Sequence, residues 1–290
     1  MSDYDPVDPP VALTIAGSDS GGGAGVQADL TTMTAHGVFG TAVVTATTAQ
    51  NTRGVEDVHP LPADHVASQY AAVADDFGVA AIKTGMLATA EIVETVTEAV
   101  ADAGVPLVVD PVMVAATGDR LLSPAAEDAY EDLIAAATLV TPNADEAAVL
   151  TDGPVETPAD AEAAGRELVA LGADAALVKG GHLADATDGD ADVDDGDAIG
   201  ETVVDTLVRA DDEAESGVVV DRFESPRIDT DATHGSGCAL SSAIAARLAG
   251  GEPLREAVEA AVAEMSEAVR RGYDVGEGPG AVNPTVLDEE

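Results

Sequence analysis

The 290-residue chain has no tryptophan, one cysteine and only two lysines, Lys83 and Lys179. One cysteine cannot form an internal disulfide and excludes a cysteine-based zinc cluster, which agrees with a reducing compartment. No apolar run approaches the roughly 20 residues of a membrane span. The acidic N-terminus also lacks the basic and apolar regions of a signal peptide. These absences predict a cytoplasmic protein that has no membrane partner.

Positive charge is scarce, because 12 Lys and Arg stand against 55 Asp and Glu, for a formal net charge of −43. Nucleic acids and anionic membranes are bound by basic patches, so this composition argues against both as partners. The acidic residues are spread along the chain and aromatics are only 2%, which favours a surface adapted to molar salt. Lys83 and Lys179 are therefore candidates for tasks that need an ammonium group, such as binding phosphate.

Short apolar runs alternate with helical segments along most of the chain. This alternation predicts an α/β fold, with one mostly parallel sheet and helices on both of its faces. No linker divides the alternation, so we expect one domain over residues 11–272. Residues 1–10 are expected to be a disordered acidic N-terminus, 184–200 an acidic mobile insertion and 273–290 a loose tail. The predicted strands are 11–16, 41–46, 79–83, 106–109, 138–141 and 175–178, followed by an antiparallel ribbon of 202–209 and 218–223.

Two glycine-rich loops each precede a predicted helix. The loop at 231–238 has small residues where the first-turn N–H groups of a helix would face a ligand, a corner suited to phosphate. The loop at 17–25 lacks the Lys-Ser/Thr pair of a Walker loop and a convincing dinucleotide spacing. We interpret it as a flexible loop that covers the substrate.

Polar side chains follow several predicted strands, at the edge where open parallel sheets bind ligands. Gln50, Asp110, Asn143 and Lys179 each come just after such a strand. Asp110 and Glu146 are hard oxygen ligands, suited to Mg²⁺ held partly through water. Either carboxylate could instead be an ordinary surface acid in so acidic a chain.

Seven motifs along the chain, taken together, closely resemble the hydroxymethylpyrimidine/phosphomethylpyrimidine kinases of the ribokinase-like superfamily. The resemblance covers roughly residues 10–272. It implies ATP-dependent phosphorylation of 4-amino-5-hydroxymethyl-2-methylpyrimidine on its alcohol, then of the monophosphate, at one site in thiamine biosynthesis. It also implies a homodimer. The motifs are 16–29 (AGSDSGGGAGVQAD), 49–52 (AQNT), 83–87 (KTGML), 110–113 (DPVM), 141–143 (TPN), 178–182 (VKGGH) and 233–238 (THGSGC).

The resemblance also implies catalytic roles for the second glycine-rich loop. Cys238 would be the base near the substrate alcohol, with the helix dipole favouring its thiolate, or would only position the alcohol. Gly235, Ser236 and Gly237 would give backbone N–H groups to the transferring phosphoryl. Taken alone, the cysteine could be a small core residue and the glycines a plain turn.

The remaining implied roles divide the site into a ring side and a nucleotide side. On the ring side, Asp29 and Gln50 would hydrogen-bond the pyrimidine nitrogens and amino group, by donor and acceptor count. Met86 and Val112 would line its apolar faces, although Met86 could be a core filler and Asp29 a helix acid. The nucleotide-side assignments are Lys179 and Asn143 for ATP, and Asp110 and Glu146 for Mg²⁺.

Two other interpretations stay open. A pyridoxal or pyridoxine kinase of the same superfamily would carry similar motifs, but Gln50, Met86 and Cys238 favour the pyrimidine. A non-catalytic pyrimidine-sensing protein could have kept the fold, but it need not keep phosphoryl-transfer residues such as Lys179 and Asp110.

Overall fold

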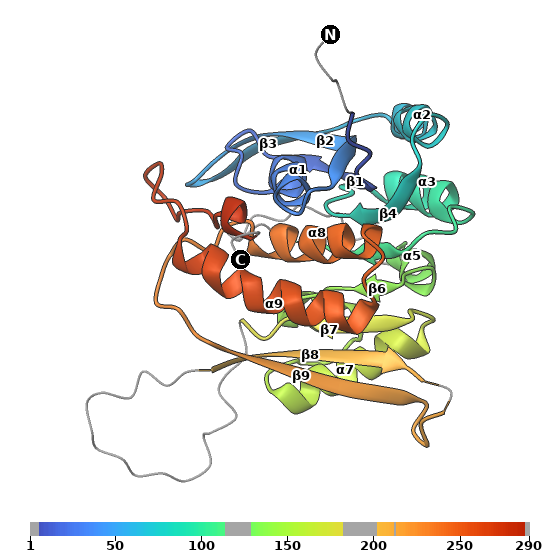
Figure 1. Cartoon of the computed structure of the whole chain (residues 1–290), viewed down its shortest axis with the longest axis vertical. Coiled ribbons are helices and arrows are strands. Elements are labelled where there is room, and N and C mark those ends of the chain that lie inside the picture. The colour runs from blue at the N-terminus through green and yellow to red at the C-terminus, as the bar shows by residue number, and fades with distance from the viewer. Residues whose placement is uncertain (1–5, 114–128, 182–201, 212, 288–290) are drawn as a thin grey trace.

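The computed structural model describes residues 6–113, 129–181, 202–211 and 213–287. Within these ranges, nine strands form one sheet in the order β3-β2-β1-β4-β5-β6-β7-β8-β9 (Figure 1). Strands β2 to β7 of this order run parallel, whereas β3, β8 and β9 pair antiparallel. The strands are β1 Val11–Ser18, β2 Phe39–Asn51, β3 Gly54–Pro60, β4 Val79–Thr84, β5 Leu107–Val109, β6 Leu139–Val140, β7 Ala175–Val178, β8 Thr202–Ala210 and β9 Val218–Pro226.

Helices cover both faces of the sheet, as the alternation predicted (Figure 1). Neighbouring strand residues point to opposite faces, so Ala81 and Val108 pack with α8 and α9, while Ile82 and Val109 belong to the core under α2, α3, α5 and α7. The helices are α1 Gly25–Ala35, α2 Ala63–Ala74, α3 Ala90–Val100, α5 Tyr130–Ala135, α6 Ala144–Leu150, α7 Pro158–Ala170, α8 Ser236–Ala249 and α9 Leu254–Arg270, with a 3₁₀ turn at Pro284–Val286. No helix in the described ranges is long and apolar enough to cross a membrane.

Strand β2 is longer than the sequence predicted. We ended this strand at Ala46, because the following residues are polar. In the structure β2 continues to Asn51 and folds back into β3, which pairs with it from Ala46 to Asn51. The hairpin partner satisfies the backbone of this polar half, so Gln50 lies within a strand rather than after one.

The C-terminal segment is packed, and the prediction of a loose tail is wrong for residues 273–287. Tyr273 and Ala281 exchange backbone hydrogen bonds of 2.7 and 3.2 Å, and Val282 N–H donates to the carbonyl of His234 at 3.0 Å. Val282 and Leu287 are 2% and 3% exposed. This segment therefore supports the glycine-rich loop before α8. Residues 6–10 have no regular structure, and the predictions for residues 1–5 and 184–200 lie outside the described ranges.

Candidate active site

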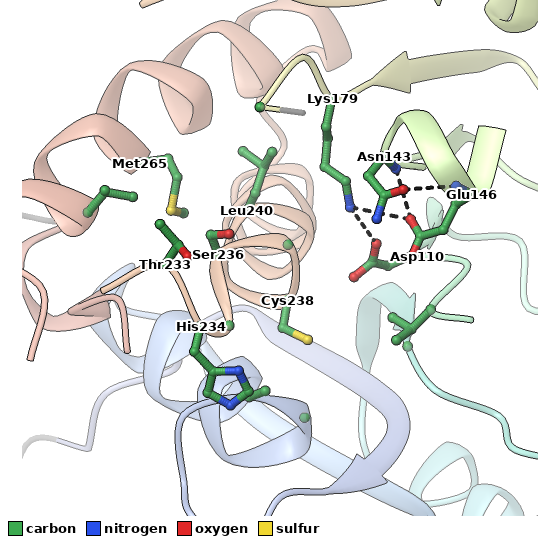
Figure 2. A pocket seen from close by; sticks show the side chains of 18 of the residues that line it. Asp110, Asn143, Glu146, Lys179, Thr233, His234, Ser236, Cys238, Leu240 and Met265 are labelled. Carbon is green, nitrogen blue, oxygen red and sulfur yellow. Dashed lines mark hydrogen bonds and ion pairs between the residues drawn. The ribbon is translucent and has the colours of Figure 1, made fainter. Parts of the chain in front are cut away.

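A cavity of about 880 Å³ lies at the carboxyl ends of the central strands, where ligands bind in open parallel sheets. The glycine-rich loops at 17–25 and 233–238 contribute to its wall, together with the residues after β4, β5, β6 and β7 (Figure 2). Of the predicted site residues, all but Asp29 line it. They are Gln50, Met86, Asp110, Val112, Asn143, Glu146, Lys179, Gly235, Ser236, Gly237 and Cys238.

The glycine-rich loop leads into the start of α8, the corner where the sequence predicts an anion site (called the anion corner below). Gly235 is the N-cap residue, in a left-handed conformation with φ +80°. A Cβ at this position would lie 1.8 Å from the carbonyl oxygen of Gly23, so the two glycine-rich loops touch here. The N–H of Ser236 donates to Thr233 O at 3.1 Å. The first-turn N–H groups of Gly237 and Cys238 are therefore better suited than that of Ser236 to receive an anion.

Cys238 lies half-buried in the cavity wall, but its charge state differs from the expectation (Figure 2). Burial raises the pKa of the thiol to about 11, against an opposing influence from Lys83. Asp29 and Asp110 raise it further. Desolvation by burial thus opposes the helix dipole, which the sequence analysis expected to favour the thiolate.

Lys179 joins two carboxylates on the opposite side of the cavity (Figure 2). Its Nζ lies 3.0 Å from Asp110 Oδ1 and 3.9 Å from Glu146 Oε2. Burial works against the ammonium charge, but these two carboxylates raise the pKa of Lys179 above its usual range. Lys179 thus lies between the carboxyl groups of Asp110 and Glu146.

Asn143 and Glu146 hold each other at the start of α6. Glu146 N–H donates to Asn143 Oδ1 and Asn143 N–H donates to Glu146 Oε2, both at 2.8 Å, which is a capping box. Burial raises the pKa of Glu146 to about 7, with Lys179 opposing and Asp110 adding to the rise. The cap therefore fixes a carboxyl that titrates near neutrality beside Lys179.

A second wall of the cavity is apolar, with an amide beside it. Met86 packs with Ala46 and Ala88, and Val112 lies against this group. Gly17 leaves room for the Met86 side chain, because a Cβ on Gly17 would lie 2.3 Å from Met86 Cε. Gln50 Oε1 accepts a hydrogen bond of 3.3 Å from Thr48 Oγ1. This wall is suited to a flat ring with a polar edge.

Asp29 is not available to a ligand, and its assignment to the pyrimidine ring fails in this structure. The side chain is fully buried and accepts hydrogen bonds from Thr14 Oγ1 at 2.6 Å and Ser242 Oγ at 2.7 Å. Lys83 Nζ lies 2.9 Å from both of its oxygens. The resemblance implied a place for Asp29 at the ring, but the sequence could not show that a lysine 54 residues later pairs with its carboxylate.

Asp19 is a site residue that sequence reasoning missed. Its carboxylate accepts hydrogen bonds from the N–H groups of Gly21, Gly23 and Ala24, at 2.7 to 3.0 Å, and lies 3.2 Å from Nε2 of His234. Burial opposes its charge, but the bond with His234 and the amides leaves the pKa of Asp19 lowered. The loop at 17–25, which we expected to be flexible, is thereby fastened to the anion corner. The sequence signal for this role is an Asp that precedes a glycine run, because Asp side chains accept hydrogen bonds from the backbone of the residues that follow.

Asp205 is a second missed residue, on β8. It lines the cavity beside Lys179, accepts a hydrogen bond of 2.7 Å from Gly180 N–H, and has a pKa raised by burial. It thus fixes the backbone that follows Lys179. Within the described residues, no group of three or more His, Cys, Asp or Glu side chains is arranged to hold a metal ion.

Comparisons with known proteins identify the family of this chain. The sequence profile of the family described as "Phosphomethylpyrimidine kinase" matches residues 19–283. The hydroxymethylpyrimidine/phosphomethylpyrimidine kinase of Streptomyces coelicolor is 46% identical over 279 residues, which are 96% of this chain and 95% of the relative.

Two solved structures show the same fold. The ADP complex of Bacillus subtilis pyridoxal kinase has a TM-score of 0.82 at 32% identity, covering 97% of this chain and 99% of the other. The phosphomethylpyrimidine kinase of Clostridium difficile 630 has a TM-score of 0.73 at 37% identity, covering 89% and 99%. With its ribokinase-like α/β fold and its anion corner facing Lys179, this chain belongs to the phosphomethylpyrimidine kinase family and is an ATP-dependent kinase.

Proposed function

We propose that this kinase phosphorylates 4-amino-5-hydroxymethyl-2-methylpyrimidine on its alcohol, and then phosphorylates the monophosphate to the diphosphate at the same site. The observation that carries the proposal is that one cavity holds a phosphate corner, a lysine with two carboxylates, and an apolar wall beside an amide. These three parts correspond to the transferred phosphoryl, the ATP phosphates and the ring. The non-catalytic alternative is set aside, because the chain is a kinase.

The ring lies, in this proposal, against Met86 and Val112, with its polar edge toward Gln50. An amide can both donate and accept, which suits an aminopyrimidine edge. Because Asp29 is fully buried, Gln50 and backbone groups of the loop at 17–25 would carry the ring's hydrogen bonds. Gly17 determines how deep the ring end of the cavity is, since it leaves room for the Met86 side chain.

The first phosphorylation needs a proton acceptor. The alcohol O–H bond breaks, its oxygen bonds to the γ-phosphorus of ATP, and ADP leaves. We assign the proton to the thiolate of Cys238, which lies in the cavity wall beside the anion corner. The second phosphorylation starts from a phosphate that is already ionised, so it needs no comparable base.

The nucleotide phosphates are assigned to Lys179 and to the first-turn amides of α8. Asn143, the N-cap residue of α6, would lie beside them. The amides are pre-oriented toward charge that develops on the transferred phosphoryl. The apolar residues Leu240 and Met265 line the same cavity and would contact the nucleotide base.

Asp110 and Glu146 fit a magnesium ion by the chemistry of their oxygens and by their shared position around Lys179. Two carboxylates suffice, since Mg²⁺ usually keeps several waters and binds substrate phosphates. Bound there, the ion would neutralise charge on the ATP phosphates.

Pyridoxal is the second candidate substrate, because the B. subtilis pyridoxal kinase has the higher TM-score of the two structures above. The deciding experiment measures ADP release in molar KCl with the pyrimidine, its monophosphate or pyridoxal in separate reactions. Cys238→Ala should lower turnover of the alcohol by about 10²-fold or more and leave the monophosphate reaction largely intact. Turnover of pyridoxal alone would refute the pyrimidine assignment.

The resemblance also supports a homodimer in the cytoplasm as part of the proposal. Sedimentation of the purified protein in molar KCl tests the oligomeric state directly, and a monomer at all concentrations would contradict it.

A further inference from the structure

Lys83 and Asp29 form an ion pair beneath the cavity, and both side chains are 0% exposed. Nζ of Lys83 lies 2.9 Å from each oxygen of Asp29. Thr14 and Ser242 donate the remaining hydrogen bonds to the carboxylate. Burial opposes the ammonium charge, but Asp29 raises the pKa of Lys83 above its usual range. The lysine is therefore charged.

Stability does not explain this pair. Taking two charges out of water costs several kcal/mol per ion, and apolar replacements of similar volume are often as stable or more so. The chain has only one other lysine. A buried ammonium at this position therefore suggests a role in the chemistry of the neighbouring cavity.

Lys83 reaches the wall of the active-site cavity, which it lines together with Gly85 and Cys238. Gly85 leaves the ammonium its space, because a Cβ there would lie 2.9 Å from Nζ. The charged groups that act on Cys238 are Lys83, Asp29, Asp110 and Lys179, and the backbone N–H of Gly25 also favours the thiolate. Lys83 is the largest of the influences that favour the thiolate.

We propose that Lys83, held in place by Asp29, is a positioning residue that stabilises the thiolate of Cys238 while the substrate alcohol is phosphorylated. This inference rests on the proposed function. In the step, the alcohol proton passes to the Cys238 sulfur, the alcohol oxygen bonds to the γ-phosphorus, and the bond from that phosphorus to the β,γ-bridging oxygen breaks. Lys83 keeps its own proton throughout.

The two phosphorylations should depend on Lys83 to different degrees. The alcohol must lose a proton, whereas the monophosphate is already ionised and needs no thiolate. A purely structural ion pair would support both reactions equally. The ratio of the two turnover numbers therefore separates the two roles.

The test uses the double variant Lys83→Met/Asp29→Asn, which removes both charges and leaves no buried carboxylate unpaired. We expect kcat for the alcohol to fall about 10- to 100-fold, since a general base contributes roughly 10² to 10⁴. The kcat for the monophosphate should change less than about threefold. If this variant does not fold, Lys83→Met/Asp29→Leu replaces the pair with apolar groups of similar volume.

Thr14→Val is the matched control, because it removes a hydrogen bond to Asp29 and keeps the ammonium. The ratio of the two reactions should then stay at the wild-type value. An equal loss of both reactions in the double variant, or a loss in neither, overturns the proposal.

A second measurement does not depend on turnover. Cys238 is the only cysteine, so its alkylation by iodoacetamide reports the thiolate. At pH 9 the double variant should react about threefold or more slowly than wild type, because the favourable effect of Lys83 on the thiolate, which is lost, is larger than the opposing effect of Asp29, which is lost with it. An unchanged rate would refute the role of Lys83. Failure of the wild type to turn over either pyrimidine would instead refute the proposed function, and the alkylation rates would still decide this inference.

Discussion

Glu146→Gln should make the protein more stable at pH 8 while lowering its activity. Residue Glu146 is 6% exposed, and burial together with Asp110 raises the pKa of its carboxyl from 4.5 to about 7, against the effect of Lys179. The folded protein therefore keeps this proton after the unfolded chain has lost it. The corresponding contribution to stability is complete below pH 4.5 and is lost as the pH rises through 7.

The size of the effect follows from the two pKa values. A difference of this size corresponds to roughly 3 kcal/mol in the free energy of unfolding above pH 7. Glutamine stays neutral and its side-chain oxygen can still accept from Asn143 N–H, so the helix cap is retained. The variant should thus resemble wild type near pH 4 and exceed it at pH 8 by up to about 3 kcal/mol.

Denaturant unfolding in molar KCl at both pH values measures the difference. Turnover should fall in the same variant if Glu146 serves the metal. The explanation would be refuted by a variant that is less stable than wild type at pH 8, or whose stability difference is the same at both pH values.

Two further substitutions test the phosphate side of the cavity. Lys179→Met should reduce kcat/KM for ATP about 10²- to 10³-fold, as the loss of other charge-stabilising groups does. Steady-state kinetics with varied ATP measures this loss, and a loss below threefold would show that Lys179 does not bind the ATP phosphates. Gly235→Ala should abolish most turnover, because the new Cβ would lie 1.8 Å from Gly23 O. Gly37→Ala is the control, since Gly37 has a similar φ of +68° but no atom within 4 Å of the new Cβ. Both variants should lose about 1–2 kcal/mol from the left-handed backbone, so equal activities in the two would contradict the loop contact.

The sheet and its helices could be predicted from the sequence because burial on two faces leaves a simple pattern. Strands such as Ala175–Val178 are short apolar runs between helices, and the structure has this strand with the predicted bounds. The capping box of α7 joins Thr157 and Asp160, which lie within four consecutive residues, so the start of this helix depends on local sequence alone. Local chemistry and local periodicity carry this information.

What the sequence could not show depends on contacts between distant segments. Polar residues 47–51 stay in a strand only because β3 pairs with them, and the tail is ordered because Val282 pairs with His234. Nothing in the sequence near Asp29 indicates that its carboxylate pairs with Lys83. The Cys238 thiol looked activated because its helix position was known and its burial was not.

The central claim is tested most directly by ADP release from the purified wild-type protein in molar KCl. Mg-ATP is supplied with the pyrimidine alcohol, with its monophosphate and with pyridoxal in separate reactions. We predict turnover with both pyrimidines. Turnover with pyridoxal alone, or with neither pyrimidine while the protein is folded, would contradict the assignment.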